Sequence, residues 1–349
     1  MDKKYHTIVF LGRFEPVHSA HAEMIRRASE LAKQVIIIVG SCDQPRTFKN
    51  PFTFEERKAM IVPIINKVVP ANVAVRIESN FDTVYDNQAW AIRVQEIVKK
   101  HTQAIDTIAL IGHKKDKSTE EYLSMFPQWK LEEIGLIEPL NATDIRDLYF
   151  RRDSNLNFIK GVVPANVLQF LEGFKNSKEY ENIIEAREFN TEYQKPYAGL
   201  KYPVIFVTVD AVVVQSGHVL MVKRKHNPGK GLWALPGGFV NACTDNSVQD
   251  AMIRELREET GIKVPVPVLI GSLNGPKGDK LPKVFDYINR SERGRTITHA
   301  YYLEFPAGPL PHVKGQDDAE KAKFIPIAEV KREQCFEDHW DIISHYINI

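Results

Sequence analysis

The stretch "TIVFLGRFEPVHSAH", residues 7–21, joins a strand-like apolar run to a loop rich in polar side chains. "TIVFL" is short, apolar and partly β-branched, which favours a buried strand. The segment that follows carries a glycine, an arginine and two histidines three positions apart, and an amphipathic stretch comes next. We therefore expect a strand, a polar loop and a helix in that order.

Two later apolar runs, "QVIIIVGS" and "TIALIGH", repeat this pattern, and helical stretches such as "NQAWAIRVQEIVKKH" alternate with them. The alternation is the βαβ rhythm of a buried parallel sheet. Each run ends in glycine and a polar residue, at the strand ends beyond which open α/β sheets bind ligands. We predict an α/β domain over residues 1–178, closed by the helix "PANVLQFLEGF" near residue 175.

The chain has 349 residues, enough for two domains of ordinary size. Residues 179–200 are polar and aromatic without sustained periodicity, and we interpret them as a partly ordered linker. From residue 201 the pattern changes, because "PVIFVTVDAVVVQSGHVLMVKRK" predicts two strands around a turn and "RTITHAYYLEF" predicts another. With one helix at 247–260 and one near the end, residues 201–349 predict an α+β domain.

The bulk composition excludes several kinds of partner. Lys and Arg number 46 against 45 Asp and Glu, so no overall field attracts nucleic acid or an anionic membrane. The longest later apolar run, "VIFVTVDAVVV", is far shorter than the roughly 20 residues of a membrane span. The cysteines, Cys42, Cys243 and Cys335, form no CxxC pair, as is usual in a reducing cytosol. We expect a cytoplasmic protein and leave its oligomeric state open, a homo-oligomer included.

His18 and His21 fall near the N-terminus of the first predicted helix, where unpaired N–H groups and the helix dipole favour phosphate. Their spacing lets both imidazoles point the same way. Gly12 lets the backbone approach a ligand closely, and Arg13 supplies a forked donor for phosphate. The imidazoles could then stabilise oxygens that gain charge as a phosphoryl bond breaks. From these residues alone, a metal site or two surface histidines are the alternatives.

This segment resembles the GRFxPxHxGH signature of the nucleotidylyltransferase superfamily, and "NATDIR", residues 141–146, resembles its second signature. "NPFTFEERKAMI" and "DNQAWAIRVQ" are similar to the subgroup that adenylylates nicotinamide mononucleotide (NMN). The resemblance implies a Rossmann-like domain in which His18 and His21 bind the phosphates of ATP. Arg13 and Arg146 would assist them.

The same resemblance implies that Arg57 lies near the nucleotide phosphates, that Trp90 stacks on the nicotinamide ring, and that Thr143 contacts substrate. Arg57 could instead pair with a glutamate of its own helix, and Trp90 could belong to the core.

Two positions depart from the signatures, because Ala20 replaces a glycine and Asn141 a serine, which puts Asn141 in doubt as a ligand. The segment "GHKKDKSTEEYLSMFPQW" also looks family-like, with Lys114, Lys115 and Asp116 near the nucleotide. A solvated run of charges is the alternative.

A second cluster lies in "PGGFVNACTDNSVQDAMIRELREETGI", where Glu255, Glu258 and Glu259 share one helical turn. Three crowded carboxylates repel one another unless cations join them, and oxygen ligands suit Mg²⁺ or Mn²⁺. The adjoining face is apolar and can pack on a sheet through Met252, Ile253 and Leu256. An ordinary surface helix with an Arg254–Glu258 pair is the alternative.

Framed by "LPGG" and "TGI", the cluster resembles the Nudix hydrolase box, GX5EX7REUXEEXGU. Its tail is complete, but two extra residues separate Gly238 from Arg254, so the first glutamate of the box is replaced by Asn246 or Thr244. The resemblance implies that Glu258 and Glu259 are the principal metal ligands. Glu255 would be a ligand or a base.

Downstream, "KVFDYINRSERGRTITHAYYLEF" and "GQDDAEKAKFIPI" resemble Nudix enzymes that split ADP-ribose. The implied contacts are a diphosphate held by Arg293 and Arg295 and an adenine stacked on Phe285 or Tyr287. The arginines could instead only decorate a hairpin. The implied base lies on a loop, and its candidates are Asp317, Asp318 and Glu320.

Together the two resemblances imply a bifunctional NMN adenylyltransferase/Nudix hydrolase family. A member would join NMN and ATP into NAD and pyrophosphate, and would split ADP-ribose into AMP and ribose 5-phosphate. Two alternatives stay open: the same folds with other nucleotide substrates, or a Nudix domain that senses ADP-ribose and regulates transcription.

Overall fold

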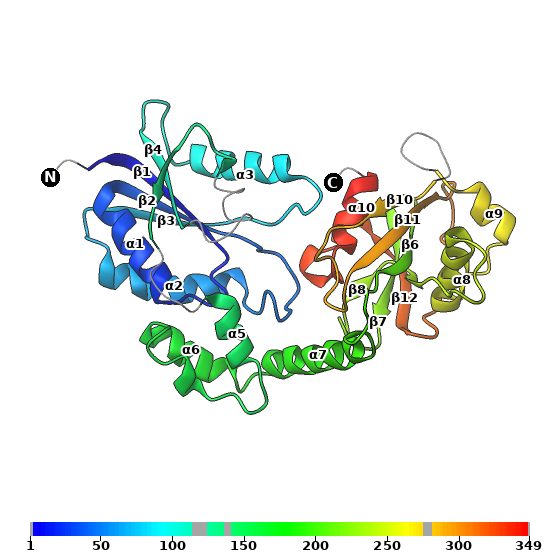
Figure 1. Ribbon diagram of the computed structural model, residues 1–349. Helices are drawn as coiled ribbons and strands as arrows, with labels where there is room; N and C mark the ends of the chain where they lie inside the picture. The colour runs from blue at the N-terminus through cyan, green and yellow to red at the C-terminus, as the bar shows by residue number, and fades with distance from the viewer. Residues whose placement is uncertain (1–2, 114–123, 136–140, 275–280, 348–349) are drawn as a thin grey trace. The chain divides into compact units, whose positions relative to one another are not determined.

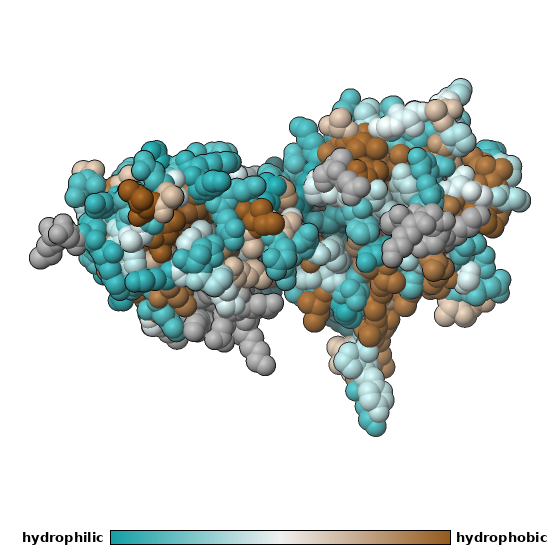
Figure 2. Space-filling model, turned by 90° about the horizontal axis from the view of Figure 1, so that it is seen from above, coloured by the Kyte–Doolittle hydropathy of each residue, from teal (hydrophilic) through white to brown (hydrophobic). Residues whose placement is uncertain are grey.

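The computed structural model describes residues 3–347 except 114–123, 136–140 and 275–280. The chain divides into two compact units, Met1–Ile184 and Glu185–Ile349, and Figure 1 shows a sheet with helices in each. Within the described residues, no helix is long and apolar enough to cross a membrane. On the face drawn in Figure 2, apolar side chains gather in separate patches among hydrophilic ones.

The first unit contains a five-stranded parallel sheet in the order β3-β2-β1-β4-β5. Its strands are β1 (Tyr5–Gly12), β2 (Ala32–Val39), β3 (Ala74–Ser79), β4 (Ile108–Gly112) and β5 (Lys130–Glu133). Its helices are α1 (Ser19–Leu31), α2 (Phe54–Val68), α3 (Asn87–Lys99), α5 (Ala142–Tyr149), η1 (Leu156–Phe158) and α6 (Ala165–Phe174). The predicted strands and the helices at α1, α3 and α6 are confirmed, but α6 does not close the unit, which extends to Ile184.

Both faces of this sheet are covered, which explains the continuous apolar runs of its strands. Alternate β1 residues face opposite ways: Ile8 and Phe10 pack with α1, α2 and α6, whereas Val9 and Leu11 pack with α3. The chain order reverses at β1, which lies between β2 and β4. The crevice beyond the carboxyl ends of β1 and β4 is thus a topological switch point, and the loop carrying the histidines begins there.

The second unit contains a seven-stranded mixed sheet with the main order β10-β11-β6-β7-β12; β8 pairs with β7 and β9 with β6. The strands are β6 (Phe206–Gln215), β7 (His218–Arg224), β8 (Trp233–Ala234), β9 (Gly237–Phe239), β10 (Lys283–Phe285), β11 (Thr296–Glu304) and β12 (Ala319–Pro326). The helices are α8 (Val248–Thr260), α9 (Val266–Gly271), η3 (Ile327–Glu329), η4 (Arg332–Gln334) and α10 (His339–Ile347). The predicted strands and both predicted helices are confirmed.

Helices cover the two faces of this sheet separately. Leu220 and Val209 pack against α8 and α9, whereas their neighbours Met221 and Val212 pack against α10. Helix α8 begins at the cap residue Ser247, whose hydroxyl accepts a hydrogen bond from the backbone N–H of Asp250, and it ends at Gly261 with a φ of 59°. A non-glycine residue would be strained at that φ.

The predicted linker, residues 179–200, is largely helical. Helix α7 runs Lys178–Gln194, η2 follows at Lys195–Tyr197, and the division between the units falls within α7. Tyr180 and Ile183 belong to the core of the first unit, whereas the Asn190 side chain donates a hydrogen bond to Glu292 of the second. Different parts of the helix face different surroundings, so no single apolar stripe runs along it.

Candidate active sites

The two histidines of the opening stretch meet at the start of α1. His18 is the N-cap, its backbone N–H donates to Nδ1 of His21 over 3.2 Å, and the ring centroids lie 3.7 Å apart. Burial lowers the pKa of His21 well below its usual value, and His18 adds to the effect. His21 is therefore neutral, and because Nδ1 accepts a hydrogen bond, its proton is on Nε2, which is left as a donor.

Gly12 makes room for a side chain of the protein. A Cβ at Gly12 would lie 3.0 Å from ring atoms of Phe14, and the close approach of a ligand to Gly12 stays a prediction. Phe14 has a φ of 58°, and its ring centroid lies 4.8 Å from that of His21. The glycine therefore shapes the turn that supports the histidine. Arg13 follows it, and among the described residues its Nη1 has no hydrogen-bond partner.

Arg57 and Arg146 are both buried beside this turn. Arg57 Nη1 donates to the carbonyls of Arg13 (2.8 Å) and Gly40 (2.6 Å), so its guanidinium is engaged by the protein. Arg146 Nη1 donates to the carbonyl of Glu15 over 2.7 Å, and its Nη2 donates to Thr143 Oγ1 over 3.2 Å. The second signature is thereby joined to the first. Thr143 itself is exposed.

The remaining residues predicted for this site have mixed surroundings. Asn141 caps α5, accepting hydrogen bonds from the backbone N–H groups of Thr143 and Asp144, which accounts for it without a ligand. Trp90 is half-buried on α3, with its ring centroid 6.0 Å from that of Phe126. Lys114, Lys115 and Asp116 lie outside the described residues.

In the second unit, α8 brings its glutamates against the "PGG" turn. The backbone N–H of Gly237 donates to Glu259 Oε2 over 2.9 Å. A Cβ at Gly238 would lie 2.6 Å from Glu255 Oε1, and one at Gly237 would lie 2.1 Å from the carbonyl oxygen of Val209. Both glycines are required because the carboxylates and the neighbouring strand approach the backbone this closely.

Arg254 lies among the carboxylates and joins them. It donates to Glu255 (2.8 Å), to Glu258 (2.9 Å) and, through Nε and Nη2, to Asp245. Counting along the sequence leaves Thr244 or Asn246 at the position of the missing glutamate of the box, but the carboxylate that reaches Arg254 is that of Asp245, which lies between them. This contact lowers the pKa of Asp245 to about 2. With two extra residues between Gly238 and Arg254, the acid beside Arg254 is thus Asp245 and not the glutamate of the box.

The glutamates suit a divalent cation, although their side chains do not surround a common point here. Among the described parts of the chain no three His, Cys, Asp or Glu side chains form a metal-holding group, and Arg254 engages two of the glutamates. Burial raises the pKa of Glu259 to about 8, and Glu255 adds to the effect; burial also raises the pKa of Glu255. Carboxylates crowded this way are stabilised by an oxygen-liganded ion, so the donor set fits Mg²⁺ or Mn²⁺.

The three candidate bases differ in their surroundings. The loop before β12 is tied to the end of α8, where the N–H of Gln316 donates to the carbonyl of Glu259 over 3.0 Å. Asp317 follows, and its charge contributes to the raised pKa of Glu255. Asp318 instead pairs with His226 at 4.0 Å, and Glu320 pairs with Lys223 at 3.9 Å. Asp317 is therefore the candidate whose charge acts on the glutamates of α8.

Two arginines and two phenylalanines lie together near the glutamates. The Arg293 guanidinium lies 5.0 Å from the ring centroid of Phe239 and 5.8 Å from that of Phe336. Arg224, which the sequence analysis did not single out, lies 4.1 Å from the Phe336 ring. Burial and the charge of Arg293 lower the pKa of Arg224, and Glu337 and Glu259 oppose them. Arg293 also lies 3.9 Å from Glu337. Two guanidiniums beside the same ring form a suitable place for a diphosphate.

The other three residues that were predicted to contact ADP-ribose differ in their surroundings. Phe285 is wrong as an adenine platform, because it is 1% exposed in the core against α10, where its ring meets His345 edge-on at 5.4 Å. Arg295 donates to the carbonyl of Asp286 over 2.6 Å and ties the loop before β11, which matches the hairpin alternative. Tyr287 is half-buried and stays a prediction.

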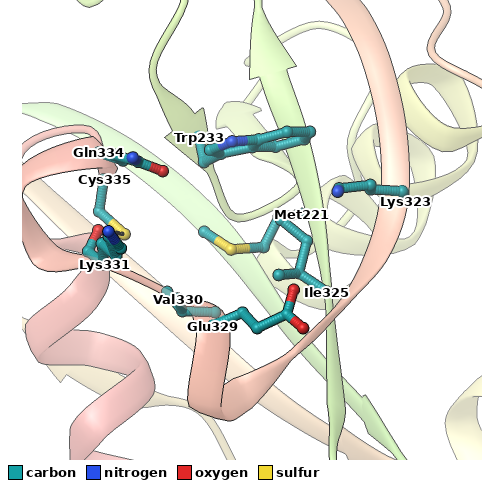
Figure 3. A pocket seen from close by; sticks show the side chains of 9 residues that line it. All are labelled: Met221, Trp233, Lys323, Ile325, Glu329, Val330, Lys331, Gln334 and Cys335. Atoms are coloured by element: carbon teal, nitrogen blue, oxygen red, sulfur yellow. Dashed lines mark hydrogen bonds between the residues drawn. The ribbon is translucent and has the colours of Figure 1, made fainter.

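A separate cavity of about 160 Å³ opens beside β7 and β12 (Figure 3). Trp233 forms one wall, Glu329 and Val330 lie opposite, and the Met221 side chain lies between them. Met221 points to the α10 face of the sheet, whereas α8 covers the other face. This cavity is therefore distinct from the glutamate cluster.

Comparison with known proteins gives a separate match for each unit. Residues 9–160 match the family model described as cytidylyltransferase-like, and residues 205–346 match the NUDIX domain model. A nicotinamide/nicotinic acid mononucleotide adenylyltransferase of Acinetobacter baylyi is 34% identical over 52% of this chain and 92% of its own length. An ADP-ribose pyrophosphatase of Methanocaldococcus jannaschii is 34% identical over 48% of this chain and 83% of its own.

The fold and the two clusters thus define a nucleotidyltransferase joined to a Nudix hydrolase. One solved structure matches both halves at once: a bifunctional NMN adenylyltransferase/ADP ribose pyrophosphatase from Francisella tularensis, complexed with AMP and a manganese ion. It has a TM-score of 0.88 and 34% identity, and 99% of each chain is covered. The chain belongs to this family of bifunctional NMN adenylyltransferase/ADP-ribose pyrophosphatases.

Proposed function

We propose that the first site transfers the adenylyl group of ATP to NMN. An oxygen of the 5′ phosphate of NMN attacks the α-phosphorus, the bond to the β-phosphate breaks, and NAD and pyrophosphate leave. The observation that carries this assignment is the close pair His18–His21 at the start of α1, whose ring centroids lie 3.7 Å apart, with Arg146 tied to the same turn. Charge develops only on phosphate oxygens, so donors suffice and no base is required.

The residues divide this work between them. Nε2 of the neutral His21 is available to donate to a phosphate oxygen, and Arg13 has a free donor for the triphosphate. Arg146 holds the turn and adds positive charge. Arg57, whose donors are used by backbone carbonyls, acts through its position rather than by direct contact. Trp90 is the proposed surface for the nicotinamide ring, and Thr143 a proposed substrate contact.

We propose that the second site hydrolyses ADP-ribose to AMP and ribose 5-phosphate, with water adding to one phosphorus of the diphosphate. Glu255, Glu258 and Glu259 would hold Mg²⁺ or Mn²⁺. When bound, the ion supplies charge that activates water and stabilises the leaving phosphate. Asp317 is the proposed base on the loop, and Arg293 and Arg224 the proposed diphosphate partners; Tyr287 is a candidate adenine contact.

Selective substitution in the full-length chain tests the two assignments together. Replacing His18 and His21 with Ala should lower NAD synthesis by about 10³-fold or more, since each lost donor to a transition-state oxyanion costs about 10²- to 10³-fold. ADP-ribose cleavage should continue. Glu258→Gln should do the reverse. Loss of both activities from either change would refute independent sites.

The substrate assignments are tested by assaying release of pyrophosphate, AMP and ribose 5-phosphate from a panel of nucleotides. ATP with NMN, and ADP-ribose, should give the highest kcat/KM for the first and second site. We place the enzyme in the cytoplasm, because Cys42, Cys243 and Cys335 are all unpaired.

A further inference from the structure

Glu15 lies inside the opening signature, yet the proposed chemistry gives it no task. Its side chain is fully buried, and so is that of Arg57, whose Nη1 lies 3.2 Å from Glu15 Oε1. A buried carboxylate is costly unless its partners are well placed. The role of the Glu15 carboxyl group beside the histidines must therefore lie in the groups that it contacts.

The pair connects the backbone segments that form the site. Oε2 of Glu15 accepts the N–H of Phe52 over 3.1 Å, just before α2. Arg57, on α2, donates to the carbonyls of Arg13 and Gly40, which follow β1 and β2. The carbonyl of Glu15 itself accepts Arg146 Nη1 from α5. Three segments distant in sequence, which follow β1, follow β2 and begin α2, therefore meet at one carboxyl group and one guanidinium. Helix α5 joins them through the backbone carbonyl of Glu15.

The charges around Glu15 are unbalanced. Arg57, Arg146 and Arg13 all act on its carboxyl group and oppose the effect of burial on its pKa. Three guanidiniums around one carboxyl group, whose charged form burial disfavours, leave a positive excess beside the proposed triphosphate site.

We propose that Glu15 is a positioning residue for adenylyl transfer: with Arg57 it holds the turn that carries Arg13 and His18 and anchors Arg146. This rests on the function proposed for the first site. Because misplaced transition-state contacts lower the rate more than they weaken binding, loss of Glu15 should reduce kcat more than it raises the KM for ATP.

The test uses the full-length chain with Glu15→Gln, Glu15→Asp and the control Glu23→Gln. Glu23 pairs with Arg26 and Arg27 on α1 at 2.7 Å, so the control also removes a carboxylate from two arginines. For Glu15→Gln we expect kcat of NAD synthesis to fall roughly 10- to 100-fold with the KM for ATP within about threefold. Glu15→Asp should recover part of the loss. The control and ADP-ribose cleavage should stay within about twofold.

A second arm keeps the proposal testable if Glu15→Gln lowers the amount of folded protein. Rates are expressed per folded molecule, and Glu15→Gln is combined with Arg57→Gln. If Glu15 acts through Arg57, the two losses in kcat should be far from additive. Additive losses, or an unchanged kcat per folded molecule, overturn the assignment while leaving adenylyl transfer in place. A wild-type chain that makes no NAD overturns both.

Discussion

The two sites solve opposite problems of charge. In the first unit, Arg13, Arg57 and Arg146 surround one buried carboxyl group, Glu15. In the second, Asp245, Glu255 and Glu258 surround one guanidinium, Arg254. Each cluster is thus built around one group of the opposite type: a buried carboxyl group among guanidiniums in the first unit, and a guanidinium among carboxylates in the second.

The difference between the clusters explains how each meets a phosphate. Guanidinium and imidazole groups donate directly to phosphate oxygens, so the first site can accept a triphosphate as it stands. Carboxylates repel a diphosphate and need a cation between them and the substrate. The second site also has two arginines, Arg224 and Arg293, beside the Phe336 ring. Four predictions test this contrast.

The largest effect should come from the loop base. Asp317→Asn should lower kcat for ADP-ribose cleavage by about 100-fold or more, since a lost general base costs about 10²- to 10⁴-fold. Asp318→Asn and Glu320→Gln are matched controls, because these acids pair with His226 and Lys223. Steady-state rates at saturating Mg²⁺ measure the effect. Equal losses of kcat in all three variants would show that Asp317 is not the base.

The next prediction concerns Asp245, which belongs to the acidic cluster of the second unit. Asp245→Asn removes the charge that positions Arg254, so the apparent affinity for Mg²⁺ or Mn²⁺ should weaken about 10- to 100-fold. Asn246→Asp tests whether the neighbouring position can substitute, and we expect no gain from it. Titration of activity with metal gives both affinities. An Asp245→Asn chain with unchanged metal dependence would show that the acid beside Arg254 does not tune the site.

The buried carboxyl group of Glu15 in the first unit should also affect how stability depends on pH. Burial raises the pKa of Glu15 from 4.5 to about 8, with Arg57 opposing it. Its contribution to stability is therefore fully present below about pH 4.5 and is lost as the pH rises through 8, by at most about 1.4 kcal/mol per pH unit. Relative to Glu15→Gln, wild-type β1 amides should lose hydrogen-exchange protection between pH 5.5 and 8. Parallel profiles for the two chains would contradict this.

The smallest expected effects on kcat/KM should distinguish Arg293 from Arg295, the two arginines that the sequence predicted as diphosphate contacts. Arg295→Ala should change kcat/KM for ADP-ribose less than about twofold, because its guanidinium is engaged by the carbonyl of Asp286. Arg293→Ala should cost about tenfold or more, since a charge-assisted contact contributes about 1.5–3 kcal/mol. If the order of the two effects is reversed, the diphosphate lies nearer the hairpin.

Local patterns were sufficient for the elements and for much of the sites. The apolar runs at β1, β2 and β4 and the two strands around the "QSGH" turn were evident from periodicity alone. The nearness of the glutamates of α8 followed from helical geometry. The spacing of His18 and His21 placed both at the start of α1, although His18 is the extended N-cap and lies outside the helix.

Contacts between distant segments could not be predicted in this way. Phe285 is an aromatic residue that could face either a ligand or α10. Only the packing of the folded chain shows that it lies in the core. The replacement of the first box glutamate by Asp245 depended on the path of a loop, which counting from Gly238 does not give.

The sequence by itself determined where strands and helices form and which short segments carry phosphate and metal chemistry, because those features depend on neighbours within a few residues. Only the tertiary structure decided which charged and titratable residues contact one another. Glu15 meets Arg57 and Arg146 across intervals of 42 and 131 residues, and electrostatic energy depends on distance in space rather than along the chain.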